Sequence, residues 1–287
     1  MRIVFTIFFF ALSVAVSSQT SKFANPTSSV PRDITQVGGD NEVERTGDFY
    51  LYWGWNISAY TASTITFSGD NYHFSLADVE AKNRPSPLDV KTYLSPVRFT
   101  IPQYNFRMGY FFNNTYNLSF GIDHMKYVMV AYQESTIDGF INTGEPDFDG
   151  AYEQAPLPIT PAFLQFEHTD GLNYVNFELR RLDQLLKSSR TSINLVTGIG
   201  TGLIIPRSNV TLMHFDRFDE WNIAGFGVAA MGGLHFELLN RLFIQLEAKA
   251  GYINLPNIRT THNKADRAKQ DFCFLQTNVV LGVKLFD

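Results

Sequence analysis

Apolar and polar residues alternate along most of the chain from Asp48 onward. In the stretch FEHTDGLNYVNFELRR, residues 166–181, polar residues tend to stand at every second position and apolar residues between them. One face carries His168, Asp170, Asn176, Glu178 and Arg180, and the other carries Val175, Phe177 and Leu179. A period of two is typical of a β-strand whose two faces meet different environments.

Eight stretches show this alternation and predict eight strands. They cover residues 48–58, 102–112, 116–130, 166–182, 191–205, 223–238, 242–253 and 272–286. Eight is a number of strands at which a sheet closes into a small barrel. We therefore predict an all-β fold, a closed antiparallel transmembrane β-barrel of eight strands.

The connections between these stretches alternate in length. Those after the second, fourth and sixth strands are short, at residues 113–115, 183–190 and 239–241. The others are long, and include residues 61–101 and 133–161. This alternation predicts short periplasmic turns at one rim and long extracellular loops at the other. Loops of that length are usually functional or disordered, so they are where we expect an extracellular ligand to bind.

Composition favours a membrane barrel over a secreted soluble barrel or sandwich. The chain is 45% hydrophobic, 15% aromatic and only 18% charged, whereas soluble domains keep about a quarter of their residues charged. The polar faces consist mostly of Gly, Asn, Gln and Ser. The net charge is -5 and no basic stripe is present, so we expect no nucleic-acid partner.

The first residues, MRIVFTIFFFALSVAVSSQT, have the layout of a secretory signal peptide, predicted to span residues 1–18. An N-terminal membrane anchor is the alternative. Residues 19–47 are polar and turn-rich and predict a flexible leader, followed by the barrel over residues 48–287. The single cysteine, Cys273, leaves no partner for an internal disulfide, and an N-terminal lipid anchor is not expected because no cysteine follows the signal.

The chain resembles the small outer-membrane β-barrel proteins of Gram-negative bacteria, particularly those of Bacteroidota. The resemblance rests on the signal, on YLYWGWN, PQYNFRMGYFF, SFGIDHMKYVMV and EHTDGLNYVNFELRR, and on the final LGVKLF. It departs at the C-terminus, where such proteins usually end on an aromatic residue, because Asp287 follows Phe286. The resemblance implies a monomer in the cell outer membrane that contacts outer-membrane lipid and lipopolysaccharide.

If the apolar face meets lipid, the other face lines the lumen. This parity predicts a lumen polar network of Arg107, Asp123, His168, Asp170, Glu178, Arg180, His235, Glu237, Glu247, Lys249 and Lys284. The interior of an eight-stranded barrel is just wide enough for side chains to fill. We therefore interpret the set as a hydrogen-bonded plug, in a protein with a structural or surface-binding role.

Two other functions stay open at this point. His168, Asp170 and Glu178 are similar in placement to the catalytic residues of barrel enzymes that deacylate lipid A, although Asp170 stands where the serine nucleophile belongs. A small-solute pore would require a gap in the plug.

No cofactor is predicted, and the metal-site signal is weak. Glu145, Asp147 and Asp149 lie close enough together to suggest a calcium site, but they lack the fixed spacing of a calcium loop. A solvated acidic loop is the favoured interpretation.

Overall fold

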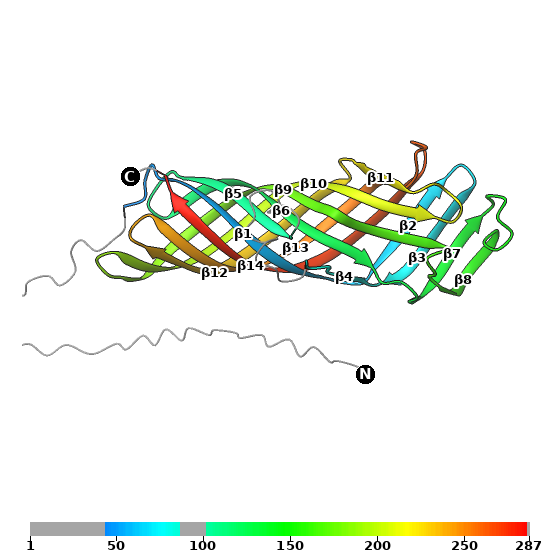
Figure 1. Cartoon of the computed structure of the whole chain (residues 1–287), viewed down its shortest axis with the longest axis horizontal. Coiled ribbons are helices and arrows are strands. Elements are labelled where there is room, and N and C mark those ends of the chain that lie inside the picture. The colour runs from blue at the N-terminus through cyan, green and yellow to red at the C-terminus, as the bar shows by residue number, and fades with distance from the viewer. Residues whose placement is uncertain (1–43, 87–101, 286–287) are drawn as a thin grey trace, which may run out of the picture. The chain divides into compact units, whose positions relative to one another are not determined.

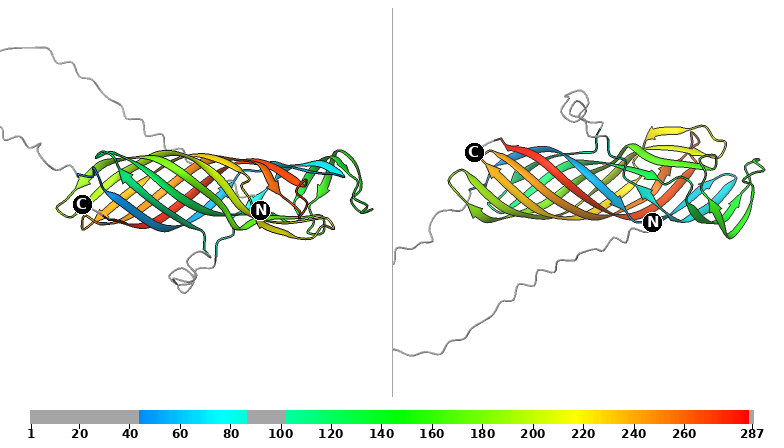
Figure 2. Two further views of the ribbon diagram at one scale, coloured as in Figure 1. Left: turned by 90° about the horizontal axis from the view of Figure 1, so that it is seen from above. Right: turned by 60° about the horizontal axis from the view of Figure 1, so that its bottom comes forward.

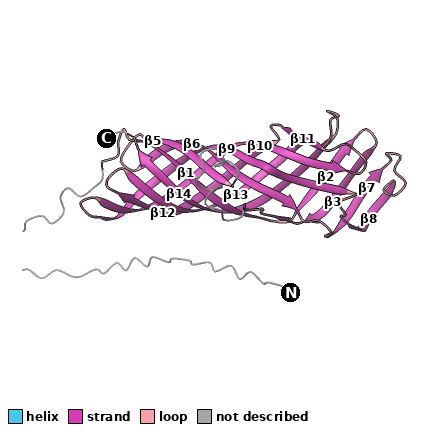
Figure 3. Cartoon of the chain, in the orientation of Figure 1, coloured by secondary structure: helices cyan, strands magenta, loops and turns pink. Residues whose placement is uncertain are grey.

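A computed structural model describes residues 44–86 and 102–285 of the chain. Strands dominate these residues (Figure 3). No helix among them is long and apolar enough to span a membrane. The predicted signal peptide, most of the predicted leader and residues 87–101 of the first long connection lie outside the described residues.

The described residues form fourteen strands. They are β1 (Phe49–Tyr60), β2 (Ser63–Gly69), β3 (Tyr72–Val79), β4 (Ala81–Lys82), β5 (Tyr104–Phe111), β6 (Tyr116–Met129), β7 (Glu134–Ile141), β8 (Gly150–Pro158), β9 (Leu164–Lys187), β10 (Thr191–Leu212), β11 (Phe218–Trp221), β12 (Gly225–Leu238), β13 (Leu242–Arg259) and β14 (Arg267–Lys284).

Eight of these strands close into a ring. The order is β1-β5-β6-β9-β10-β12-β13-β14, and every neighbouring pair is antiparallel. β14 returns to pair with β1 from Tyr50↔Lys284 to Tyr60↔Phe274, which completes the circle (Figure 1). The prediction of a closed, eight-stranded antiparallel barrel is confirmed, and each ring strand arises from one of the eight alternating stretches.

The long connections are more ordered than predicted. β2, β3 and β4 arise from residues 61–101, and β7 and β8 arise from residues 133–161. β2 pairs with the start of β14 from Ile65↔Gln270 to Ser68↔Arg267, and β3, β7 and β8 follow in order. Short alternating runs such as STITFSG supply these strands, so treating the connections as loops was wrong for their described parts.

The four-stranded layer β2-β3-β7-β8 lies beyond one end of the ring, and the short turns lie at the other (Figure 2). We call this layer, together with the adjoining ends of β6, β9, β10, β13 and β14, the head. β11 pairs with β10 at the same end, and β4 pairs with β6.

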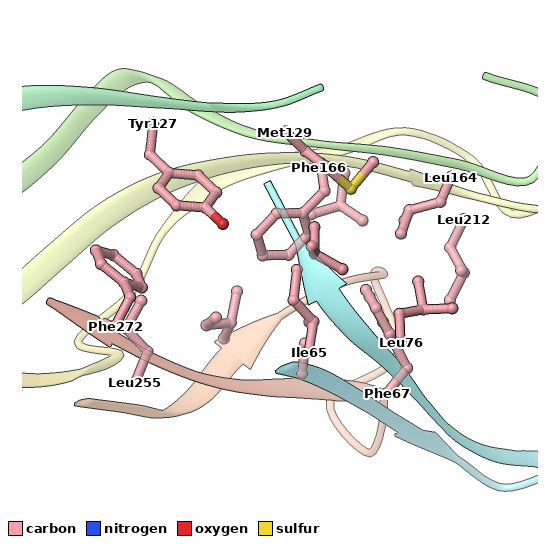
Figure 4. Close-up of a cluster of buried hydrophobic side chains, with 14 of the residues drawn as sticks. Ile65, Phe67, Leu76, Tyr127, Met129, Leu164, Phe166, Leu212, Leu255 and Phe272 are labelled. Atoms are coloured by element: carbon pink, nitrogen blue, oxygen red, sulfur yellow. The ribbon is translucent and has the colours of Figure 1, made fainter. Parts of the chain in front are cut away.

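The head has a hydrophobic core of its own. Phe67 of β2 stacks on Phe74 of β3, with ring centroids 5.2 Å apart, and meets Phe166 of β9 edge-on at 6.0 Å. Figure 4 shows the side chains of Tyr127, Phe272 and Leu255 converging on the same core from three ring strands. The layer therefore packs on the ring through buried apolar side chains and covers the opening opposite the short turns.

The outside of the ring carries an apolar band. Large apolar side chains point away from the lumen and stay exposed, for example Ile57 at 59%, Phe177 at 57% and Ile199 at 65%. The band covers outward-facing positions within residues 49–57, 104–112, 116–122, 175–186, 193–205, 226–238, 242–252 and 273–285. A continuous apolar belt around a closed ring is far larger than the patches that soluble monomers expose.

Candidate functional site

The centre of the lumen is filled by six charged side chains. Arg107 comes from β5, Asp123 from β6, Glu178 and Arg180 from β9, and Glu247 and Lys249 from β13, and all six are buried. Inward-facing residues on different strands of the ring can lie at the same level of the barrel. This brings residues that are distant in sequence together. Three cations thus meet three anions in this central cluster.

Glu178 is the hub of the central cluster. Its Oε1 lies 2.9 Å from Arg107 Nη2 and 2.7 Å from Lys249 Nζ, and its Oε2 pairs with Arg180. Lys249 Nζ also lies 2.6 Å from Asp123 Oδ2, and Arg180 Nη1 lies 3.1 Å from Glu247 Oε2. Each buried charge therefore has an opposite charge beside it, the condition under which ions are tolerated in a low-dielectric interior.

Neutral groups complete this network. The Tyr52 hydroxyl of β1 accepts hydrogen bonds from Arg107 Nε at 3.0 Å and from Arg180 Nη2 at 2.9 Å. Asn176 accepts from Arg107 Nη2 at 2.8 Å and donates to Asp123 Oδ2 at 3.1 Å. The bonds join β1, β5, β6, β9 and β13 across the lumen, so the plug ties together most of the ring.

A second charged layer lies toward the short turns. Lys284 Nζ is 2.8 Å from Glu237 Oε1 and 3.5 Å from Asp48 Oδ2. His235 Nδ1 is 3.2 Å from Gln245 Oε1, and Gln245 donates to Glu247 at 2.7 Å, which links this layer to the central cluster.

The segment before β1 enters the barrel mouth. The Arg45 guanidinium is buried there, and it donates to the backbone oxygen of Asn114 at 3.0 Å and to the Asn194 side chain. Backbone bonds Gly47 N to Phe111 O and Phe111 N to Asp48 O fasten the segment to β5. The segment therefore covers the lumen at the end of the short turns.

Little space remains between the layers. Arg45, Arg180, His235, Glu237 and Lys284 help to line a cavity of about 20 Å³. A water molecule needs roughly 10–15 Å³ by this measure, so the cavity is the size of one water.

Asp170 does not face the lumen as predicted. β9 carries extra residues at this point, because Leu172 pairs with Met125 but His168 pairs with Tyr127, so three β9 residues oppose Lys126 alone. Gly171 takes a positive φ of 127° in this bulge. The bulge sends the Asp170 carboxylate outward, where its Oδ2 lies 2.8 Å from Arg207 Nη1.

His168 does lie inside, but in the apolar core of the head. Its ring centroid is 5.1 Å from that of Phe166 and 5.7 Å from that of Tyr127. Its Nδ1 is 3.0 Å from Ser208 Oγ, and its Nε2 is buried with no hydrogen-bond partner. Burial lowers the pKa of His168 to about 3, so the imidazole is neutral at ordinary pH.

The three residues of the deacylase-like interpretation are not brought together. His168 is sealed in the head, Asp170 is on the outside, and Glu178 is held by three cations in the lumen. Ten residues of β9 separate His168 from Glu178, roughly 30 Å at about 3.3 Å per residue. This arrangement cannot pass a proton between them.

The acidic loop is held by its own backbone. Asp149 Oδ1 accepts from Thr143 N at 2.7 Å, and Asp149 Oδ2 accepts from Gly144 N at 2.8 Å. Glu145 Oε1 lies 3.6 Å from His214 Nδ1. Across the described ranges 44–86 and 102–285, no group of three or more acidic, histidine or cysteine side chains is arranged to hold a metal ion, and Asp147 joins no such group.

Comparison with known proteins gives fold neighbours at low similarity. No protein-family model and no curated protein matches the chain. Among solved structures, the outer-membrane protein OprG of Pseudomonas aeruginosa is 9% identical, with 86% of this chain and all of OprG covered and a TM-score of 0.41. The outer-membrane protein AlkL is 11% identical, with 93% and 99% covered and a TM-score of 0.38. The outer-membrane protease OmpT of Escherichia coli is 7% identical, with 85% and 98% covered and a TM-score of 0.25.

Tyr52, Arg45 and Asp48 lie in the lumen but are absent from the network predicted from the sequence. Tyr52 lies within the first alternating stretch, whereas Arg45 falls in the predicted leader and Asp48 at the border between the two. The sequence marks the last two only by their charge, with Arg45 shortly before the first alternating stretch and Asp48 as its first residue. Charged side chains next to the start of a strand can fold back into the opening of a barrel.

Proposed function

We propose that this protein is a closed outer-membrane anchor that displays a rigid β-sheet head at the cell surface for binding. The observation that carries the proposal is the filled lumen. The paired charges of the central cluster occupy its middle, the Arg45 segment covers one opening, and the head core covers the other. A barrel sealed at three levels supports an anchoring role over a small-solute pore.

The apolar band supports placement in a membrane. Its exposed side chains suit hydrocarbon, while the strands satisfy their backbone groups by closing on each other, as a bilayer requires. The short turns would then face the periplasm and the head would face outward, in contact with lipopolysaccharide. A source in Bacteroidota, export by the signal peptide and a monomeric state stay predictions from the sequence.

The closed lumen is tested by conductance. We expect the purified protein in planar bilayers to give no steady ion conductance and to leave sugar-loaded liposomes intact. Double replacement of Glu178 and Arg180 by Ala should introduce leak. Steady channels from the unaltered protein would contradict the proposal.

The orientation is tested on intact cells. An epitope inserted between Thr143 and Gly144, in the turn between β7 and β8, should bind antibody without permeabilisation. The same epitope inserted between Leu239 and Asn240, in the β12–β13 turn, is the matched control and should bind only after lysis. The reverse pattern would contradict the outward placement of the head.

A further inference from the structure

The outermost strand of the head has an unpaired edge. β8 pairs with β7, and this is its only strand pairing among the described residues (Figure 1). An edge strand presents a row of backbone N–H and C=O groups that a further strand can use.

One hydrogen bond next to the β7–β8 ladder and one next to the β3–β7 ladder assign the edge. Ile159 N donates to Gln133 O at one end, so alternation along an antiparallel pair places Pro158 and Pro156 on the open side. At the other end Asn142 N donates to Asn71 O, on the β3 side. By the same alternation Gly139 and Ile141 of β7 bond toward β8.

The open edge is therefore in two parts. Pro156 and Pro158 supply no N–H, which blocks strand addition there as edge prolines generally do. Gly150 and Tyr152 bond inward to β7, which leaves the N–H groups of Ala151 and Glu153 on the open side. A bulge at Gln154, where φ is 47°, separates the two parts. Residues 150–153 form the accessible part of the edge.

Charge around this edge selects the partner. The segment from Glu134 to Pro158 contains no Lys or Arg. Its acidic residues are Glu134, Asp138, Glu145, Asp147, Asp149 and Glu153. A second copy of the chain would bring the same acidic hairpin against itself, which like-charge repulsion disfavours. A strand rich in Lys or Arg would meet complementary charge.

We infer that the edge of β8 at residues 150–153 binds an extended, basic polypeptide segment by strand addition. Backbone pairing would supply the geometry, and the acidic hairpin would supply the preference for positive charge. This inference rests on the proposed function, since it names the partner class of the displayed head.

Binding of two labelled peptides tests the inference. The full chain in uncharged detergent micelles is titrated into a ten-residue alternating Lys-Val peptide or the matching Glu-Val peptide, followed by fluorescence anisotropy. We expect saturable binding of the lysine peptide alone. Absence of lysine-peptide binding would overturn the inference.

Two proline variants separate strand addition from charge attraction. Ala151→Pro removes a donor from the open edge and should weaken binding about tenfold, the effect of losing one or two hydrogen bonds. Pro156→Ala restores a backbone N–H donor on the part of the edge that proline blocks, and should strengthen binding. The test therefore does not depend on the folding of a single variant. Equal affinity for both variants and the unaltered chain would overturn the inference in favour of surface adsorption.

Charge variants complete the test. Glu153→Lys should weaken binding of the lysine peptide more than Asp216→Lys, which makes the same charge change in the turn before β11. Sedimentation of the micelles shows whether the edge pairs with a second copy instead; a dimer that Ala151→Pro dissolves would overturn the basic-peptide assignment. Absence of conductance in the same preparation would leave the anchoring function standing even if the peptide fails to bind.

Discussion

At the scale of single residues, the molecule depends on a few buried charges and on the buried imidazole of His168. Glu178 faces three cations, whereas Asp170, which lies before it on β9, forms an exposed pair with Arg207. A carboxylate therefore contributes very differently to stability at the two positions, because solvent screens the exposed ion pair and not the buried one.

Replacing Glu178 with Gln should destabilise the barrel strongly. The change leaves three buried cations facing two anions, and removing one partner of a buried ion pair costs about 3–5 kcal/mol. Urea unfolding in detergent micelles measures the free energy of unfolding. Asp170→Asn is the control and should cost less than about 1 kcal/mol. Equal effects of the two changes would contradict the hub role of Glu178.

Acidification should loosen the head through His168. The pKa of this imidazole is lowered by burial to about 3, whereas the unfolded value is about 6.5. The unfolded state therefore binds the proton first, and the head loses up to about 1.4 kcal/mol for each pH unit that the pH falls between those values. The urea midpoint of head unfolding at pH 7.5 and pH 5 measures the loss. His168→Gln should reduce this pH dependence; an unchanged dependence would assign it to other groups.

At the scale of elements, bulges and short strands decide where side chains go. The bulge at Gly171 turns Asp170 outward and lets β9 return to its inward pattern at Leu172. A Cβ at Gly171 would collide with the Asn173 side chain and lie 2.8 Å from the His124 ring. Glycine is therefore required there for both its conformation and its size.

Gly171→Ala should cost about 1–3 kcal/mol of stability, because a side chain is both strained at this φ and crowded. Gly150→Ala is the matched control, since the nearest atom to a Cβ there is 3.8 Å away and its φ is not positive. Thermal unfolding in micelles compares the two. Similar melting temperatures for both variants would contradict the account of the bulge.

At the scale of the whole molecule, the chain should behave as a barrel that resists detergent. Backbone pairing around a closed ring leaves no edge for SDS to open, so the unheated protein should migrate differently from the boiled protein on a gel. A β-type circular dichroism spectrum should accompany the unheated form. Identical mobility before and after heating would contradict the fold.

Much of this architecture was predictable from the sequence, because alternation is a local property. The eight ring strands follow from it directly, and so does the inward direction of Arg107, Glu178 and Lys249. The prediction for Asp170 was wrong because a bulge changes which face of the strand the following or enclosed residues occupy. The polar and apolar pattern of the sequence gives little sign of such a bulge. The head strands were missed because runs such as STITFSG are short, and only packing on the ring makes them strands.

The pairing of β1 with β14 joins stretches separated by most of the described chain. Contacts of such long sequence separation are slow to form, since a large loop must be ordered before they are gained. Closure must therefore await β14, and until then β1 offers an unpaired edge. A chain whose ring is still open would need protection during that interval, and the time to closure would set how long it stays vulnerable to aggregation and proteolysis.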